Sequence, residues 1–187
     1  MPNPNTVAVV VGSLRKGSFS RLTANALGTC APPSLKTQIV EIADLGLYNQ
    51  DSDANPPANW TSFREKIKAA DAVLFVTPEY NRSVPGVLKN ALDIGSRPYG
   101  SSAWNGKPGA VVSNSPGAIG GFGANHHLRQ SLVFLNVPVM QQPEAYVGGI
   151  ATAFDEQGNL VDDSKKQFFT AFMKAFADWV ELNKAKT

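Results

Sequence analysis

Three short apolar runs in this chain each end in a loop that is rich in glycine, proline or polar residues. The runs cover Thr6–Val11, Ala72–Thr77 and Ala110–Ser113. Continuous apolar runs of this length are typical of parallel strands that are buried on both faces of a sheet. In an open parallel sheet, ligands bind beyond the carboxyl ends of the strands. We therefore expect three loops to meet at one site: the first loop (12–21), the second loop (78–85) and the third loop (113–121).

Segments with helical spacing alternate with strand-like segments along the chain. The predicted strands are 6–11, 36–42, 72–77, 110–113 and 137–140. The predicted helices are 20–27, 60–70, 84–94, 122–135 and 163–184. Alternation of this kind gives a parallel sheet covered on both faces. The sequence thus predicts a single α/β domain over residues 1–187, a flavodoxin-like three-layer α/β/α fold whose five-stranded parallel sheet has the order 2-1-3-4-5.

Two of these elements carry further signals. Pro138 limits the pairing of strand 137–140 on one side, because proline has no backbone N–H. The last helix places four aromatic side chains on one stripe, and these are Phe168, Phe172, Phe176 and Trp179. A stripe of this kind indicates an amphipathic helix that covers the sheet rather than a cofactor site.

Composition excludes several classes of protein. With 43% hydrophobic and 17% charged residues, the chain can build a full core, and its net charge of +2 is too small to indicate nucleic-acid binding. Cys30 is the single cysteine, so no internal disulfide can form, and this favours a reducing cytoplasm. The run Val7–Val11 is too short for a signal or membrane segment, so we expect no membrane insertion.

The first loop has the residues of a phosphate site. A dinucleotide-binding loop needs glycine at its third position, where this chain has Leu14, and a P-loop needs Gly-Lys-Ser/Thr, whereas Gly17 precedes Ser18. What remains is a set of hydroxyls and cations that opens a helix: Ser13, Ser18 and Ser20 with Arg15, Lys16 and Arg21. Helix N-termini favour anions, so a terminal phosphate suits this loop. The alternative is a polar loop that only caps the helix.

The second and third loops suit a flat ring. Tyr80 offers an aromatic face, Asn81 offers an amide, and Glu79 can accept a hydrogen bond from a ring N–H or from a sugar hydroxyl. The alternative for Glu79 is a surface ion pair with Arg82. The third loop allows close approach of its backbone to a ligand through three glycines, Gly117, Gly120 and Gly121. A flexible connector is the alternative for that loop.

Taken in order, these motifs resemble the NAD(P)H-dependent FMN reductases of the flavodoxin-like superfamily, and among them the bacterial quinone and chromate reductases. The resemblance runs from about Val7 to Gly149. It is carried by Gly12-Ser13-Leu14-Arg15 with Ser18 and Ser20, by Thr77-Pro78-Glu79-Tyr80-Asn81 with Ser83-Val84-Pro85-Gly86, and by Ser115-Pro116-Gly117-Ala118-Ile119-Gly120-Gly121.

The resemblance implies FMN as a tightly bound cofactor, with NADPH or NADH as co-substrate. The residues implied to hold its phosphate are Ser13, Arg15, Ser18 and Ser20. Those implied to face the ring are Pro78, Glu79, Tyr80, Asn81 and Ser83, with Ser115 and Gly117 on its other side. The family also implies a homodimer, often a homotetramer.

One part of the family pattern is altered in this chain. Tetrameric relatives join their dimers through a contact of Arg and Tyr with Glu. Glu144 is kept here, but Gly123 and His126 stand at the Arg and Tyr positions, which puts the tetramer contact in doubt and leaves the dimer. His126 and His127 are adjacent in a helix and point in different directions, so we expect no metal site.

The expected reaction is a two-electron, ping-pong reduction of quinones, with chromate and other oxidants as side substrates. Arg82 and Arg97 are candidates for attracting anionic acceptors or dinucleotide phosphates, with solvated charges as the alternative. Tyr80 is a candidate for a proton donor, beside water. Two other functions are considered: a one-electron flavodoxin-like carrier that docks to a protein partner, and a non-catalytic FMN-binding interaction protein.

Overall fold

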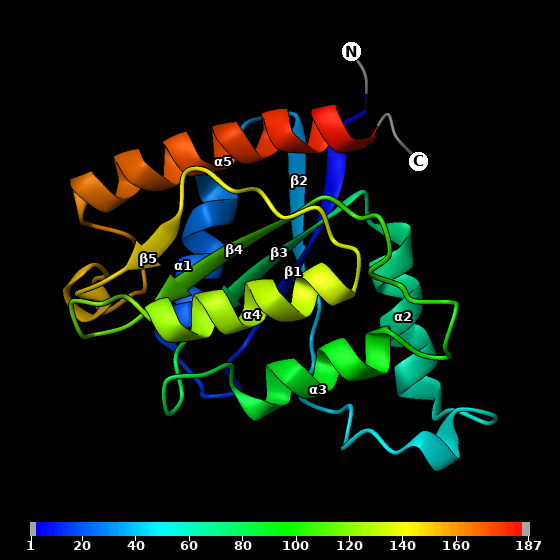
Figure 1. Ribbon diagram of the computed structural model, residues 1–187. Helices are drawn as coiled ribbons and strands as arrows, with labels where there is room; N and C mark the ends of the chain where they lie inside the picture. Colours follow the sequence, from blue (N-terminus) through cyan, green and yellow to red (C-terminus); the bar gives the residue numbers. More distant parts are fainter. Residues whose placement is uncertain (1–2, 185–187) are drawn as a thin grey trace.

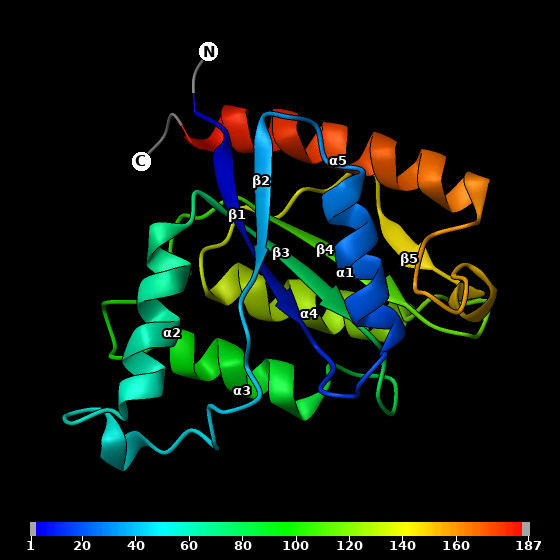
Figure 2. The same cartoon turned by 180° about the vertical axis from the view of Figure 1, so that it is seen from behind.

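The computed structural model describes residues 3–184 and contains a five-stranded parallel sheet between two layers of helices (Figures 1 and 2). The strands are β1 (Asn5–Val11), β2 (Leu35–Ile39), β3 (Ala72–Thr77), β4 (Gly109–Asn114) and β5 (Ala145–Val147). The order β2-β1-β3-β4-β5 confirms the predicted flavodoxin-like topology. All four strand pairs are parallel.

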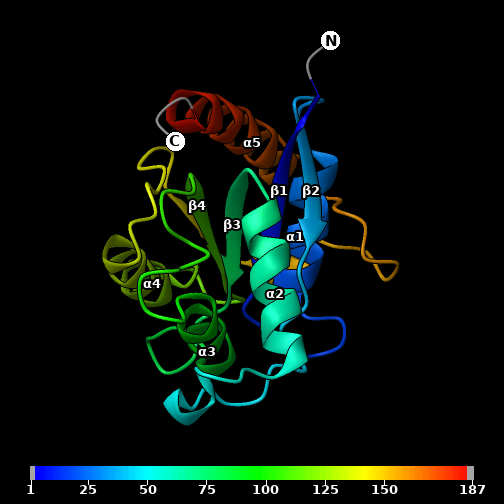
Figure 3. The same ribbon diagram turned by 90° about the vertical axis from the view of Figure 1, so that its right-hand side faces the viewer.

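The helices divide between the two faces of the sheet, as Figure 3 shows. They are α1 (Phe19–Thr29), α2 (Ala58–Ala69), α3 (Gly86–Gly95), α4 (Phe122–Phe134) and α5 (Asp163–Lys184), with short 3-10 turns at Gln50–Ser52 and Ile150–Thr152. Successive side chains of a strand point to opposite faces. In β1, Val7 and Val9 therefore pack against α1 and α5, while Ala8 and Val10 pack against the layer of α2, α3 and α4.

The fifth strand differs from its prediction. The predicted strand 137–140 makes only one isolated bridge, between Gly109 and Val139, and the strand that pairs with the carboxyl half of β4 is Ala145–Val147. Pro138 offers a carbonyl to the N–H of Gly109 but has no N–H of its own to continue a ladder. The apolar run 137–140 thus packs into the core at the amino end of β4. The fifth strand is formed further along the chain, by Ala145–Val147.

Two further elements deviate in detail. The second strand ends at Ile39, before the predicted end at residue 42. In α5 the fully buried stripe is centred one residue away from the predicted one and consists of Phe169, Phe172, Met173, Phe176 and Val180. Phe168 and Trp179 are partly buried at its margins. The helix still covers the sheet as predicted.

No helix within the described residues is long and apolar enough to cross a membrane.

Candidate functional site

The three loops meet at the carboxyl edge of the sheet. The loops that follow β1 and β3 lie side by side there in Figures 1 and 2. Side chains from all three loops line one cavity of about 230 Å³, and these are Ser13, Arg15, Ser18, Phe19, Ser20, Pro78, Glu79, Tyr80, Asn114, Ser115 and Pro116. The convergence predicted from three separate motifs is therefore present in the folded chain.

The first loop supplies hydroxyl groups at the start of α1. Ser18 is the N-cap of this helix, and its Oγ accepts a hydrogen bond from the N–H of Arg21 at 3.1 Å. Ser20 lies in the first turn, where backbone N–H groups have no acceptor within the helix. Its Oγ lies 3.2 Å from Nδ2 and 3.3 Å from Oδ1 of Asn114, and both residues are buried. Hydroxyl groups and free backbone N–H groups at the positive end of a helix can donate hydrogen bonds to a phosphate group.

The three cations of the first loop have different environments. Arg15 lines the cavity, and its guanidinium lies 5.5 Å from the ring centre of Phe19. Lys16 is exposed and does not line the cavity. Arg21 instead makes two hydrogen bonds of 2.6 and 2.7 Å to Glu41, which raise the pKa of Arg21 and lower that of Glu41. Of these three cations, only Arg15 lines the cavity.

The second loop is a small hairpin. Tyr80 and Ser83 exchange two backbone hydrogen bonds of 3.0 Å, and the intervening Asn81 and Arg82 have φ angles of 51° and 64°. Positive φ at both central residues is the requirement of a type I′ turn. Pro78, Glu79 and Tyr80 line the cavity, and the Tyr80 side chain is half exposed. Asn81 is exposed and is not among the lining residues.

Two side chains of the second loop turn toward α4. The Oγ of Ser83 lies 2.9 Å from Nδ1 of His127. Glu79 uses one oxygen to accept the N–H of Ala124 at 3.0 Å and the other to pair with Arg82 at 3.3 Å. The ion pair considered as the alternative for Glu79 is therefore present, although this residue also borders the cavity.

The third loop is shaped by its glycines. The Oγ of Ser115 accepts the N–H of Gly117 at 3.1 Å, and Ser115 lines the cavity whereas Gly117 does not. Gly120 has a φ of 65°, and a Cβ built on it would lie 2.4 Å from the backbone carbon of Tyr146. Gly121 is also left-handed and forms the N-cap of α4. These glycines form a tight turn onto β5 and do not line the cavity, whereas Asn114, Ser115 and Pro116 of this loop do.

A buried polar network behind the third loop was missed by the sequence analysis. Asn125 is fully buried and donates from Nδ2 to the Oγ of Ser113 and to the carbonyl of Ala145, both at 3.2 Å. Arg129 donates to the Oδ1 of Asn125 at 2.9 Å and to the carbonyl of Met140 at 3.0 Å. An asparagine on the apolar face of the predicted helix was the available signal for this network.

Arg97 is not brought to this cavity. It follows the far end of α3, a helix that starts just after the second loop, and ten residues of helix span about 15 Å. Its Nε donates to the hydroxyl of Tyr48 at 3.0 Å, and its guanidinium lies 5.7 Å from the centre of that ring. Arg82, by contrast, lies in the second loop with 75% of its side chain exposed.

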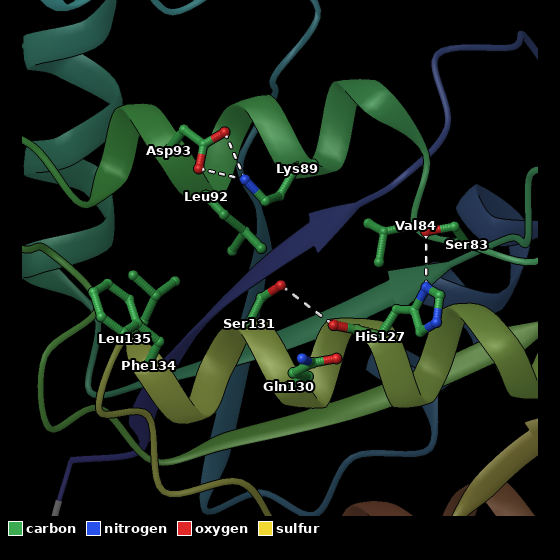
Figure 4. A pocket seen from close by; sticks show the side chains of 10 residues that line it. All are labelled: Ser83, Val84, Lys89, Leu92, Asp93, His127, Gln130, Ser131, Phe134 and Leu135. Atoms are coloured by element: carbon green, nitrogen blue, oxygen red, sulfur yellow. Dashed lines mark hydrogen bonds and ion pairs between the residues drawn. The ribbon is translucent and has the colours of Figure 1, made fainter.

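A second and larger cavity lies between α3 and α4 (Figure 4). Its volume is about 510 Å³, and it is lined by Ser83, Val84, Lys89, Leu92, Asp93, His127, Gln130, Ser131, Phe134 and Leu135. Phe134 and the neighbouring Val133 have 85% and 77% of their surface exposed. This cavity reaches the second loop only through Ser83 and Val84.

The two histidines of α4 have different partners. Nε2 of His126 lies 2.8 Å from the hydroxyl of Tyr146, while His127 faces Ser83. Burial, and then the neighbouring Glu144, raise the pKa of Tyr146 to about 12. Within residues 3–184 no group of three or more His, Cys, Asp or Glu side chains is arranged to hold a metal ion.

Sequence comparisons show which known proteins this chain is similar to. Residues 5–152 match the family model described as NADPH-dependent FMN reductase. The chain is 65% identical to a quinone reductase of Pseudomonas putida over 181 residues, which cover 96% of this chain and 97% of that protein. It is 47% identical to a 2-hydroxy-1,4-benzoquinone reductase of a Burkholderia species, with 93% and 95% covered.

A solved structure is also similar over almost its whole length. The flavoenzyme NAD(P)H:(acceptor) oxidoreductase FerB from Paracoccus denitrificans superposes with a TM-score of 0.90 at 41% identity. The match covers 96% of this chain and 98% of that structure.

Proposed function

The chain belongs to the NADPH-dependent FMN reductase family, and on that premise we propose that it reduces quinones by two-electron transfer from NAD(P)H. It is an NAD(P)H-dependent oxidoreductase with FMN as its cofactor. The observation that carries the proposal is the cavity at the carboxyl edge of the sheet, where hydroxyls at a helix N-terminus meet an exposed aromatic loop. The quinone reductase with 65% identity supports the choice of acceptor.

The donor set of the cavity fits a flavin phosphate. The residues that would hold the phosphate are Ser13, Arg15, Ser18 and Ser20. Three of these are buried hydroxyls, and Arg15 adds the positive charge. Hydrogen bonds to a charged group contribute about 1.5–3 kcal/mol each. Ser20 is oriented by Asn114, so its hydroxyl is held in place before any ligand binds.

The remaining predicted residues are proposed to border the ring. These are Pro78, Glu79, Tyr80, Asn81 and Ser83 on one side and Ser115 and Gly117 on the other. Pro78, Glu79, Tyr80 and Ser115 line the cavity and support this assignment directly. For Asn81, Ser83 and Gly117 the proposal is that their backbone positions shape the loops, since their side chains or Cα atoms do not reach the cavity.

FMN supplies the hydride-accepting and hydride-donating chemistry when it is bound. The protein binds its phosphate, leaves one side open to substrates, and provides positive charge near the mouth. We propose a ping-pong order in which NAD(P)H and the oxidant use the same open side in turn. Tyr80 is half exposed and lines the cavity, and its hydroxyl is the candidate to hold a proton there, with water as the alternative. Replacing it in Tyr80→Phe should lower turnover clearly only if the hydroxyl, and not water, delivers the proton.

The choice of oxidant follows from the openness of the site. An exposed loop with an aromatic side chain accepts flat molecules of several kinds, and quinones are the proposed physiological acceptors. The exposed Arg82 would attract anionic oxidants, and chromate reduction is proposed as a side activity on that ground.

We further propose that the protein works as a homodimer in the cytoplasm. The exposed Val133 and Phe134 beside the cavity between α3 and α4 support a surface that another copy could cover. A homotetramer remains the alternative. In this chain His126 is bonded to Tyr146 within the same chain, which is a different arrangement from the Arg and Tyr contact of the tetrameric relatives.

An anaerobic titration tests the function. The purified protein is expected to be yellow, to bleach fully with NADPH or NADH without accumulating one-electron-reduced flavin, and to recover its colour with benzoquinone. Accumulation of the one-electron form would favour a carrier. Against a carrier stands the net charge of +2, because carriers of this kind tend to have an acidic docking surface. A flavin that no reduced nicotinamide bleaches would favour the interaction protein.

A further inference from the structure

The second loop is fastened to α4 by contacts that flavin binding does not itself require. One contact joins Glu79 to the N–H of Ala124, and another joins Ser83 to His127 one helical turn later. We call these two contacts the loop–helix clamp. They hold both ends of the hairpin that carries Tyr80 and Asn81.

The carboxylate of Glu79 completes the N-terminus of α4 from outside the helix. The N-cap of α4 is Gly121, which makes no side-chain capping bond, and the first turn contains no acidic residue. An N-terminal turn lacks acceptors for its N–H groups and is stabilised by a negative charge. Glu79, in the second loop, provides both a hydrogen-bond acceptor and a negative charge, and its side chain is only 13% exposed.

Gly123 makes this close approach possible. A Cβ at this position would lie 2.8 Å from the carbonyl oxygen of Arg82 and 2.9 Å from Oε2 of Glu79. Real Cβ atoms do not approach other atoms so closely, so any larger residue would push the second loop away from the helix. The glycine at position 123 is therefore matched to Glu79 in this chain.

The turn held by the clamp has an unfavourable backbone conformation. Asn81 and Arg82 both have positive φ, which asparagine tolerates and arginine adopts rarely. A non-glycine residue keeps such a conformation only when its surroundings enforce it. Glu79 precedes the turn and Ser83 follows it, so the clamp acts on both sides of the strained pair.

We propose that Glu79 is a positioning residue: its carboxylate fixes the second loop on the N-terminus of α4 and so presets the backbone that borders the flavin ring. The role differs from a direct hydrogen bond to the ring, which was the expectation from the sequence. It rests on the assignment of the second loop to the ring in the proposed function. The contact of Glu79 with Ala124 also links the second and third loops, because α4 begins where the third loop ends.

The test compares Glu79→Ala with Glu79→Gln and with Glu65→Gln, which removes an exposed carboxylate on α2. Amide hydrogen exchange of Ala124 is measured in the protein freed of FMN, and the FMN dissociation constant and midpoint potential are measured after reconstitution. In Glu79→Ala we expect the Ala124 amide to exchange at least about tenfold faster, FMN to bind about tenfold more weakly, and the potential to shift. Glu79→Gln keeps an acceptor oxygen and should restore part of the protection, and Glu65→Gln should match the wild type.

Gly123→Ala provides an independent variant because Glu79 remains in place. The added Cβ should displace the loop and reproduce the weaker FMN binding and the shifted potential. Faster exchange at Ala124 with an unchanged FMN dissociation constant and potential would overturn the positioning role, since it would leave Glu79 as a helix cap only. Unchanged exchange would overturn the contact itself. Because exchange is read without FMN, failure of the clamp is distinguishable from failure of the flavin assignment.

Discussion

The two edges of the sheet are built from different kinds of polar contact. At the carboxyl edge, buried hydroxyl and amide side chains stand around a cavity, and these include Ser13, Ser18, Ser20 and Asn114. At the amino edge, polar side chains hydrogen-bond to distant parts of the chain. Asn5 accepts from Lys184 at 2.6 Å and donates to Glu181, and Asp71 accepts the N–H and the hydroxyl of Thr6 at 2.8 and 2.9 Å.

This difference separates the residues that we expect to bind a ligand from those that we expect to stabilise the fold. At the amino edge, Asn5, Thr6 and Asp71 hydrogen-bond to partners within the chain, so these side chains contribute to folding. At the carboxyl edge the hydroxyls are preorganised by neighbours such as Asn114 and by the start of α1 but face a cavity. Substitutions at the amino edge should change the free energy of unfolding. Substitutions at the carboxyl edge should change ligand affinity.

The largest expected effect is at the carboxyl edge. Arg15→Ala removes the one loop cation that lines the cavity and should weaken FMN binding by about tenfold or more. Riboflavin lacks the phosphate, so its affinity should not change. Fluorescence titrations with both flavins check this, and Lys16→Ala is the matched control because Lys16 is exposed and lies off the cavity. Equal weakening of both flavins would show that Arg15 does not bind the phosphate.

The next effect is at the amino edge. Lys107 donates from Nζ to the carbonyls of Lys68 and Ala70 at 3.0 and 2.6 Å, at the C-terminal end of α2. Lys107→Met keeps the aliphatic stem but loses these bonds, and should lower the free energy of unfolding by about 1–2 kcal/mol. Chemical denaturation of the variant and of the exposed Lys66→Met measures the difference. A change in FMN affinity would contradict the separation of the two edges.

A smaller effect at the amino edge depends on pH. Burial raises the pKa of Asp71, but the hydrogen bonds from Thr6 and the charge of Lys184 outweigh it and hold that pKa below its ordinary value of 3.8. A depressed pKa in the folded state stabilises the protein above the unfolded value and loses this effect as the pH falls through the folded pKa. Asp71→Asn should therefore cost less than about 1 kcal/mol at pH 7, because solvent screens this partly exposed carboxylate.

The pH series distinguishes this charge effect from a packing effect. Denaturation curves at steps from pH 7 to pH 3 should show the wild type and Asp71→Asn converging below about pH 4. A difference that stays constant over this range would mean that the carboxylate charge contributes nothing.

The smallest effect is expected for Arg97→Ala. This residue lies with Tyr48 beyond the far end of α3, away from the carboxyl edge. KM values for NAD(P)H and for quinone should therefore stay within about twofold of the wild type, whereas Arg82→Ala should raise KM for an anionic oxidant. A large rise in KM for Arg97→Ala would show that the substrate site extends well beyond the three loops.

Much of this molecule followed from local sequence patterns. Buried parallel strands read as apolar runs, so β1, β3 and β4 and the strand order were predictable. The short β5 was not, because a three-residue strand leaves almost no pattern, while Val137–Met140 has an apolar pattern but packs without forming a ladder. The hydroxyls of the first loop were predictable for a similar local reason, since Ser18 and Ser20 open a helix.

The sequence alone determined that three polar loops follow three buried strands, and therefore that a ligand site lies at one edge of the sheet. Only the tertiary structure decided which side chains of those loops reach the cavity. Arg21 pairs with Glu41, and Glu79 caps α4, because each found a partner from a distant part of the chain. Such pairings depend on how helices and loops pack together, and residue type and spacing do not encode them locally.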